Sequence, residues 1–315
     1  MRILPREISV VVQGAVNKCE TARCLKSLRI YLPEAQVILS TWKGSDTQGL
    51  DYDECVLSED PGSIGFHYYK DKVVPYNFNR QLVSTVAGLA AAERKYALKM
   101  RTDFYLKGNK FLCYFDFYPA RNAEFNYFRH RVIVPSVFSR RFSDGTGFPL
   151  PFHPSDFFFF GLKEDVRDYF SHCEFLSKAE GCEWQYKFSH RKPYLSETGR
   201  YTPEQHLCLA WLEWHGMKPD YEDFSDWSED VLCLSDKILF NNFIFLNPAA
   251  IGVSSGKHHN ALLRADLCPW YGLITQDVFE QEYKRYFDVA FKLARRNDSK
   301  LLYYAKKLYC KLRMH

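Results

Sequence analysis

Short apolar runs alternate with amphipathic segments along the first hundred residues. A run of four to seven apolar residues is typical of a strand buried on both faces of a sheet. Apolar residues spaced three or four apart are typical of a helix with one apolar face. Because strands alternating with helices form βαβ units, the pattern predicts an α/β fold, a mostly parallel sheet flanked by helices. The expected strands are 8–12, 36–42, 54–57 and 96–100, and the expected helices are 17–31 and 79–96.

The alternation becomes less regular from residue 131. One predicted helix has strong end signals, with Thr202 as N-cap, Pro203 in its first turn and Gly216 just past its end. The acidic segment 220–230 is expected to be a solvated loop. The other expected elements are a strand at 131–135, a loop rich in glycine and proline at 144–154, a strand at 156–161, and helices at 163–170, 203–215, 276–296 and 299–312.

Positive charge is concentrated at the C-terminal end. Residues 292–315 hold eight Lys or Arg and one acid, a net charge of +7, which leaves −3 for the rest of a chain whose total is +4. In 299–315 the apolar residues fall on one helical face and the basic residues mostly off it. This pattern predicts either a helix lying on an anionic membrane surface or a helix packed on its own domain with a solvated basic face.

Composition narrows the class of protein. Ten cysteines form no CxxC pair and no regular framework, which indicates reduced thiols in a cytosolic protein. The chain has no apolar run suited to a signal peptide or to crossing a bilayer, so we expect a cytoplasmic protein, with peripheral contact to the inner face of the cell membrane as an option. A net charge of +4 gives no indication of a nucleic-acid partner. The high aromatic content, 17%, favours an aromatic-rich core over aromatic binding clefts.

Polar residues follow three of the expected strands, at Gln13–Gly14, 40–46 and 101–103. In an open α/β sheet, ligands bind outside the carboxyl ends of the strands. The first strand is followed neither by GxGxxG nor by a Walker motif, which argues against a dinucleotide-dependent dehydrogenase and against a P-loop enzyme.

A helix that begins at 77–81 and a following strand that ends in Asp103 resemble the nucleotide-sugar glycosyltransferases of the GT-A fold. The resemblance implies a GT-A-like (Rossmann-like) sheet, a diphosphate held by Arg80, and a divalent cation, Mn²⁺ or Mg²⁺, bound by an acid pair of the DxD type. Arg101 stands where the first acid is expected, so only Asp103 remains. Metal dependence is therefore open, since Arg101 could pair with the diphosphate directly.

The same resemblance assigns binding residues. Trp42 could stack on a base or a sugar, or could be a hydrophobic plug. His258 and His259 lie in a loop rich in glycine and serine, where such enzymes often carry a last metal ligand, although an adjacent His pair in a loop is more often simply exposed. The expected metal ligands are Asp103, His258 and His259. The residues expected to bind the nucleotide sugar, with a UDP-sugar as first choice, are Gln13, Gly14, Thr41, Trp42, Asp46, Arg80, Arg101 and Asp103.

Two carboxylates are candidates for the general base that accepts the proton of the incoming hydroxyl. Glu204 opens a predicted helix, in a layout that resembles inverting GT-A enzymes. An equally good interpretation is that Glu204 merely complements the helix dipole. Asp156 is the second candidate, and its alternative role is to cap the start of a strand.

A more specific resemblance is carried by joined motifs in the same order. They are similar to the bacterial WavE-type lipopolysaccharide-synthesis family over roughly residues 6–170, and weakly after that. The resemblance implies assembly of a surface polysaccharide, such as a lipopolysaccharide core or a capsule, without identifying a donor or an acceptor. The motifs are 8–14, 39–46, 79–81, 99–103 and 151–156 followed by 160–162.

Together the resemblances imply a glycosyltransferase that moves a sugar from a nucleotide sugar to a hydroxyl of a lipid-linked lipopolysaccharide or capsular glycan. Two alternatives are a sugar nucleotidyltransferase, which normally has a Gly-rich loop after the first strand, and a non-catalytic membrane scaffold with a degenerate transferase fold, which Arg101 would favour. The expected domains are a GT-A-like catalytic domain over 1–270, with a nucleotide-binding half (about 6–106) and an acceptor half (about 107–270), and C-terminal amphipathic helices over 271–315.

Overall fold

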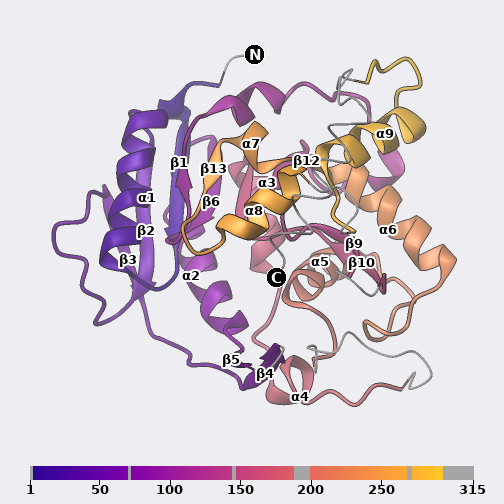
Figure 1. The fold of residues 1–315 in the computed structure, drawn as a ribbon, viewed down its shortest axis with the longest axis horizontal. Coiled ribbons are helices and arrows are strands. Elements are labelled where there is room, and N and C mark those ends of the chain that lie inside the picture. The colour runs from indigo at the N-terminus through magenta and orange to yellow at the C-terminus, as the bar shows by residue number, and fades with distance from the viewer. Residues whose placement is uncertain (1–2, 70–71, 144–146, 188–198, 268–271, 294–315) are drawn as a thin grey trace.

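The structure is a computed structural model that describes residues 3–69, 72–143, 147–187, 199–267 and 272–293. Its centre is a seven-stranded sheet in the order β12-β8-β11-β6-β1-β2-β3 (Figure 1). Strands β3, β2, β1 and β6 are parallel neighbours, β11 runs antiparallel to β6 and β8, and β12 is parallel to β8. The predicted mixed α/β fold with a mostly parallel sheet is confirmed. The strands are β1 (Ile8–Gln13), β2 (Gln36–Trp42), β3 (Glu54–Ser58), β6 (Tyr96–Arg101), β8 (Val132–Pro135), β11 (Phe158–Leu162) and β12 (Phe243–Leu246).

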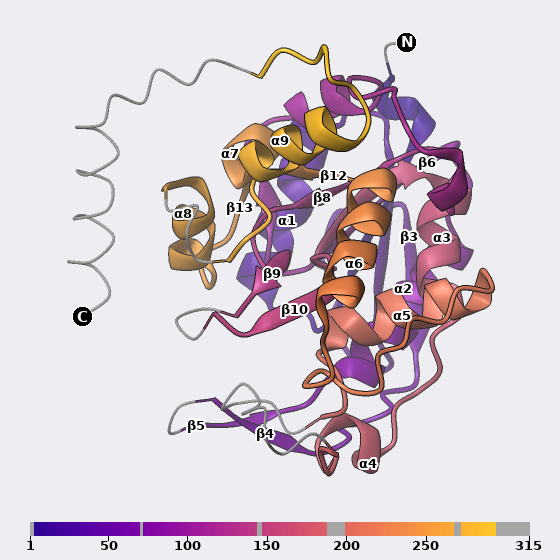
Figure 2. The ribbon, with the colours of Figure 1, turned by 90° about the vertical axis from the view of Figure 1, so that its right-hand side faces the viewer.

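Helices cover the sheet, and three short strand pairs lie around it. In Figure 1, α1 lies beside the β3 end of the sheet, whereas α6 and α9 lie at the β12 end. Figure 2 shows the β4–β5 pair beside α4 at one end of the molecule. The pairs are β4 (Phe66–Tyr69) with β5 (Lys72–Pro75), β7 (Tyr105–Leu106) with β13 (Val253–Ser254), and β9 (Arg140–Phe142) with β10 (Pro149–His153). The helices are α1 (Lys18–Tyr31), α2 (Phe78–Ala90), α3 (Lys163–Ser171), α4 (Lys178–Gly181), α5 (Pro203–Trp214), α6 (Glu229–Asn242), α7 (Pro248–Ile251), α8 (His259–Leu267) and α9 (Gln276–Tyr286).

One close approach fixes α2 on the sheet. At Gly88 an added Cβ would lie 2.4 Å from Val11 Cγ1 and 2.9 Å from Ser40 Cβ, too close for either atom. Glycine therefore lets the helix axis come nearer to β1 and β2 than any larger residue would permit. The first turn of α2 is thereby held beside the carboxyl ends of these strands.

The aromatic residues mostly fill the core, as predicted. Phe157, Phe158, Phe159 and Phe160 are all at most 1% exposed. Around them lie rings from distant elements, with Tyr169 4.7 Å from Phe159 and Phe111 5.0 Å from Phe160 between ring centroids. The contact of Phe111 with Phe160 is edge-to-face, and ring contacts of this kind add to the burial of apolar area. The described cysteines form no disulfide with one another, and the reduced state stays a prediction.

Two predicted helices are too long. The helix predicted over 79–96 is α2, which ends at Ala90, because the amides of Glu93 and Arg94 donate to Ser9 Oγ (3.1 and 3.0 Å) and the chain turns into β6. The helix predicted over 276–296 is α9, which ends at Tyr286. Asp288 follows with a turn in which its carboxylate accepts from the amide of Ala290 (3.1 Å).

The second half departs from prediction in several places, and α6, which no predicted element covers, is the longest element that was missed. The acidic segment 220–230 is not a solvated loop, since Asp223 is fully buried and its Oδ1 accepts from the amide and hydroxyl of Ser225 (2.9 and 2.6 Å). Strand β10 lies within the predicted loop 144–154. Strand β12 was not anticipated, because α6 runs into it at Phe243 without a turn residue between them.

The described part of the expected C-terminal appendage belongs to the core. Phe279 and Tyr283 of α9 are fully buried, and Phe279 lies 6.1 Å from Phe245 of β12 between ring centroids. The predicted helix over 299–312 lies outside the described residues. Within the described residues, no helix combines the length and apolar character needed to cross a membrane. The domain boundaries expected near 106 and 270 stay predictions.

Candidate active site

A cleft of about 780 Å³ opens at the carboxyl ends of β1 and β6. These strands are neighbours, but the chain leaves β1 through α1 toward β2 on one side, while β6 lies on the other. Such a reversal of strand order is where open α/β sheets bind ligands. The cleft is lined by Gln13, Gly14, Ala15, Val16, Asn17, Glu20, Trp42, Asp60, Pro75, Tyr76, Asn77, Phe78, Arg80, Gln81, Arg101, Thr102, Asp103, Pro203 and Lys257.

The floor of the cleft is formed by the carboxyl ends of β1 and β6, which lie side by side in the sheet. Gln13 Oε1 accepts from Ser84 Oγ of α2 (2.8 Å), and the amide of Thr102 donates to the Gln13 carbonyl (3.1 Å). Gly14 has φ +118°, a conformation that other residues rarely adopt, and the neighbouring Thr102 hydroxyl donates to the carbonyl of Ala15 (2.7 Å). The predicted residues Gln13 and Gly14 therefore shape the cleft through the backbone.

Arg80 lies in the first turn of α2 and faces the cleft. Its guanidinium makes a bidentate pair with Asp60 (2.7 and 2.8 Å) and donates to Asn77 Oδ1 (2.9 Å). The pairing raises the pKa of Arg80 and lowers that of the Asp60 carboxyl. The arginine is thus held in one orientation at the mouth of the cleft.

Asp103 lies on the opposite wall beside an arginine, a lysine and a histidine. Arg101 donates to both of its oxygens (2.9 and 2.6 Å), His258 Nε2 lies 3.4 Å from it and Lys257 Nζ 3.8 Å. Burial opposes ionisation of this carboxyl, but the hydrogen bond from His258 and the charge of Arg101 hold its pKa well below the usual range. Asp103 is therefore an anion at any physiological pH.

The expected metal ligands are only partly together. His258 lies beside Asp103 and is fixed by stacking on Phe104 (5.3 Å between centroids). His259 instead begins α8 and lines a different cavity together with Lys107. Among the described residues, no group of three or more His, Cys, Asp or Glu side chains is placed to hold a metal ion. Because both oxygens of Asp103 are already held by a guanidinium, these residues fit a divalent cation poorly.

The two candidate bases lie behind the cleft wall, and neither lines the cleft. Asp156 is 8% exposed, and its carbonyl accepts a short hydrogen bond from the ammonium of Lys99, which is fully buried. Burial lowers the pKa of Lys99 to about 8, although the charges of Asp156 and Glu204 oppose that shift. Glu204 Oε2 lies 3.7 Å from His153 Nε2; burial and then Arg140 lower the pKa of His153 to about 3, so this contact is no ion pair at neutral pH.

Three other predicted residues follow β2. Trp42 lines the cleft. Thr41 is fully buried and its hydroxyl lies 3.2 Å from Ser45 Oγ, so it supports the loop without facing the cleft. Asp46 is an exposed carboxylate that pairs with Lys18 (2.6 Å) and does not line the cleft.

Besides Glu20 in the first turn of α1, sequence reasoning missed two charged residues of the cleft, Asp60 and Lys257. Lys257 stands in a Ser-Ser-Gly-Lys segment, a loop composition that could have drawn attention to it. Asp60 lies 20 residues before the arginine that it holds, and no local pattern marks it. Both enter the site through contacts between segments far apart in the chain.

Comparison with known proteins agrees with the motifs at the strand ends. A family model described as WavE lipopolysaccharide synthesis matches residues 8–309. The likeness therefore continues well past residue 170, where the motifs alone became weak. No curated protein matches the chain. With nearly its whole length matched, the chain belongs to the WavE family, whose role is in lipopolysaccharide synthesis.

Proposed function

We propose that this protein is a glycosyltransferase with a GT-A-like fold, which moves a sugar from a nucleotide sugar to a lipopolysaccharide core or capsular glycan. One observation carries the proposal. A single cleft at the sheet's reversal point brings together two arginines, a lysine and a half-buried tryptophan from four separate segments. Such a set suits a ligand with a diphosphate and a planar base.

The diphosphate would lie between the two walls. Arg80 stands on one wall, and Arg101 and Lys257 stand on the other. The first residues of α2 and α5, Phe78 and Pro203, also line the cleft, so the positive ends of two helix dipoles face the same space. Charge developing on a nucleoside diphosphate leaving group would be neutralised by these groups.

Trp42 ends β2 beside this space and offers an aromatic face for the nucleobase. Glu204 and Asp156 stay the candidate bases; Pro203, which precedes Glu204, lines the cleft, although neither carboxylate does. The divalent cation expected from the resemblance also stays a prediction. The pairing of Asp103 with Arg101 supports the alternative, in which arginine and lysine supply the positive charge.

Calorimetric titration of the full-length protein with UDP tests the proposal. Arg80→Gln should weaken UDP binding at least tenfold, because a charged hydrogen bond to phosphate contributes about 1.5–3 kcal/mol. Arg29→Gln is the matched control. Arg29 is also a half-buried arginine paired with carboxylates, Asp51 and Asp53, but it lies outside the cleft. Its variant should bind UDP within twofold of the parent.

The titration is repeated with GDP, with UTP, and with Mn²⁺ or EDTA present. Preference for a diphosphate supports the transferase. If the cationic side chains suffice to bind the diphosphate without a metal ion, UDP affinity should change less than threefold between Mn²⁺ and EDTA. Preference for the triphosphate would favour a nucleotidyltransferase. A folded protein that binds no nucleotide would contradict the proposal and favour the scaffold.

A further inference from the structure

A second groove, of about 880 Å³, runs along α5 away from the cleft. Pro203 at the start of α5 lines the cleft, whereas His206, Ala210 and Trp214 on one face of the same helix line the groove. The ring of Phe78, on the cleft wall, lies 5.8 Å from that of His206. The groove therefore begins within a turn of the cleft and follows the helix from His206 to Trp214, about 12 Å at 1.5 Å per residue.

Two large aromatic side chains in the groove are exposed. Trp214 is 64% exposed and Phe175 54%. Both rings line the same recessed, polar surface and offer apolar faces on which a ligand can stack. The apolar faces of sugar rings stack on such side chains, while sugar hydroxyls bond to the polar groups around them.

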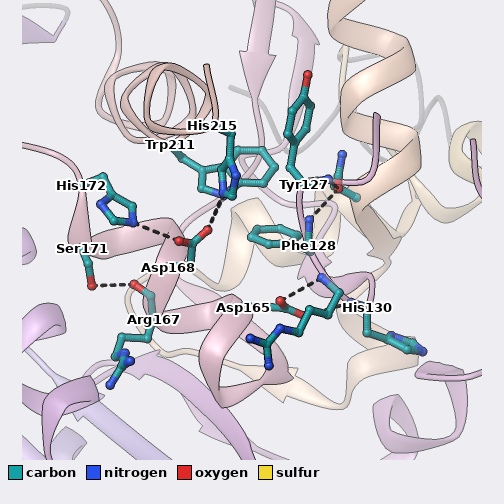
Figure 3. Close-up of polar contacts among 12 residues, drawn as sticks. Tyr127, Phe128, His130, Asp165, Arg167, Asp168, Ser171, His172, Trp211 and His215 are labelled. Carbon is teal, nitrogen blue, oxygen red and sulfur yellow. Dashed lines mark hydrogen bonds and ion pairs between the residues drawn. The ribbon is translucent and has the colours of Figure 1, made fainter. Parts of the chain in front are cut away.

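Trp214 is held in place before any ligand arrives. Its ring stacks on that of His172 at 4.0 Å and 8°. Figure 3 shows Asp168 of α3 between His172 and His215, with its oxygens 2.9 and 2.7 Å from their Nε2 atoms. Asp168 also accepts from Trp211 Nε1 (3.0 Å). Because an anchored imidazole backs the indole, little conformational freedom is lost when a ligand stacks on it.

The charge of the groove restricts the ligand. Five carboxylates line it against one arginine and one lysine, and these two cations pair with Glu180 (3.5 Å) and Glu213 (3.3 Å). A phosphorylated or uronate-rich glycan would be repelled by the remaining negative charge. Neutral hexoses, whose hydroxyls donate to carboxylates, meet no such barrier.

We propose that this groove binds the acceptor as an uncharged stretch of glycan, with Trp214 and Phe175 stacking on its sugars and the acceptor hydroxyl placed at the Pro203 end. The assignment of this glycan as acceptor rests on the proposed transferase function. Binding of the glycan itself does not, since it is measured without a nucleotide.

The test uses the full chain on an array of deacylated bacterial core oligosaccharides, each present with its phosphates and after their removal by hydrofluoric acid. We expect binding to the dephosphorylated members, weakened at least tenfold by Trp214→Ala and by Phe175→Ala. Phe117→Ala is the matched control, because Phe117 is 55% exposed and does not line the groove. It should bind as the parent does.

UDP titration of the same variants separates the two proposals. Unchanged UDP affinity in Trp214→Ala and Phe175→Ala shows that these proteins are folded and that the groove acts on glycan alone. If the parent protein binds glycans on the array but does not bind UDP, the proposed nucleotide-sugar site would be wrong and the glycan groove would stand. Array binding that is absent, confined to phosphorylated members, or equal in parent and variants would overturn the inference.

Discussion

His206 is a buried, neutral imidazole between the cleft and the groove. It is 8% exposed and packs between Phe78 (5.8 Å) and Tyr201 (5.2 Å). Burial, and then the charge of Arg200, lowers its pKa to about 3. Below pH 6.5 the unfolded chain takes up a proton at this residue, but the folded protein does not. Folding is therefore increasingly disfavoured as pH falls from 6.5 toward 3.

Replacing this histidine should make the protein more resistant to acid. Between pH 7 and pH 4.5 the parent should lose about 2 to 3 kcal/mol of unfolding free energy more than His206→Leu does. Urea unfolding at both pH values measures the difference. Equal losses in the two proteins would show that His206 is protonated in the folded state.

Single residues of the site were predictable where they follow a strand. Gln13 and Asp103 come directly after apolar runs, and the parallel arrangement of those runs brings their ends together. Arg80 was predictable from its place at the start of a helix. Asp60, which pairs with Arg80, and Lys257, which lies beside Asp103, were not predictable, because each meets its partner only after folding.

At the scale of elements, the seating of α2 on the sheet depends on a missing methyl group. Gly88→Ala should lower the unfolding free energy by about 1 to 2 kcal/mol, although alanine favours a helix by about 1 kcal/mol. The added Cβ would meet Val11 Cγ1 at 2.4 Å. In denaturant titrations, Gly88→Ala should cost less unfolding free energy when Val11→Ala is also present. The coupling between the two substitutions should be at least about 0.5 kcal/mol. Fully additive effects would mean that the helix shifts away freely.

Elements with local end signals were predicted well. Thr202 caps α5 by accepting from the Gln205 amide (3.2 Å), in the position that the sequence indicated. The end of α2 was missed because it depends on Ser9, more than 80 residues earlier in the chain. Strand β12 was missed because no glycine or proline marks the end of α6 before it. The last residue of α6 is Asn242, whose side-chain amide donates to the Phe125 carbonyl (2.8 Å).

At the scale of the whole molecule, the basic segment 299–315 is predicted to lie on an anionic membrane surface, with packing on its own domain as the alternative. Each lysine near an anionic leaflet contributes about 1 kcal/mol. The full chain should sediment with phosphatidylglycerol vesicles and not with phosphatidylcholine vesicles. Reversing four charges should abolish this sedimentation and leave UDP affinity unchanged. The residues to change to glutamate are Lys300, Lys306, Lys307 and Lys311. Sedimentation that survives the reversal would mean that the segment is not the anchor.

The pairing of Arg80 with Asp60, and of Arg101 with Asp103, also bears on how the molecule tolerates the cell's pool of small anions. Each guanidinium already pairs with a carboxylate. An incoming anion must therefore displace that carboxylate or share the guanidinium with it. A lone orthophosphate ion has a single centre of charge and meets one wall at a time, which leaves it little advantage over the resident partner. A ligand with two linked phosphates meets both walls together, so competition by orthophosphate should be slight even at millimolar concentration.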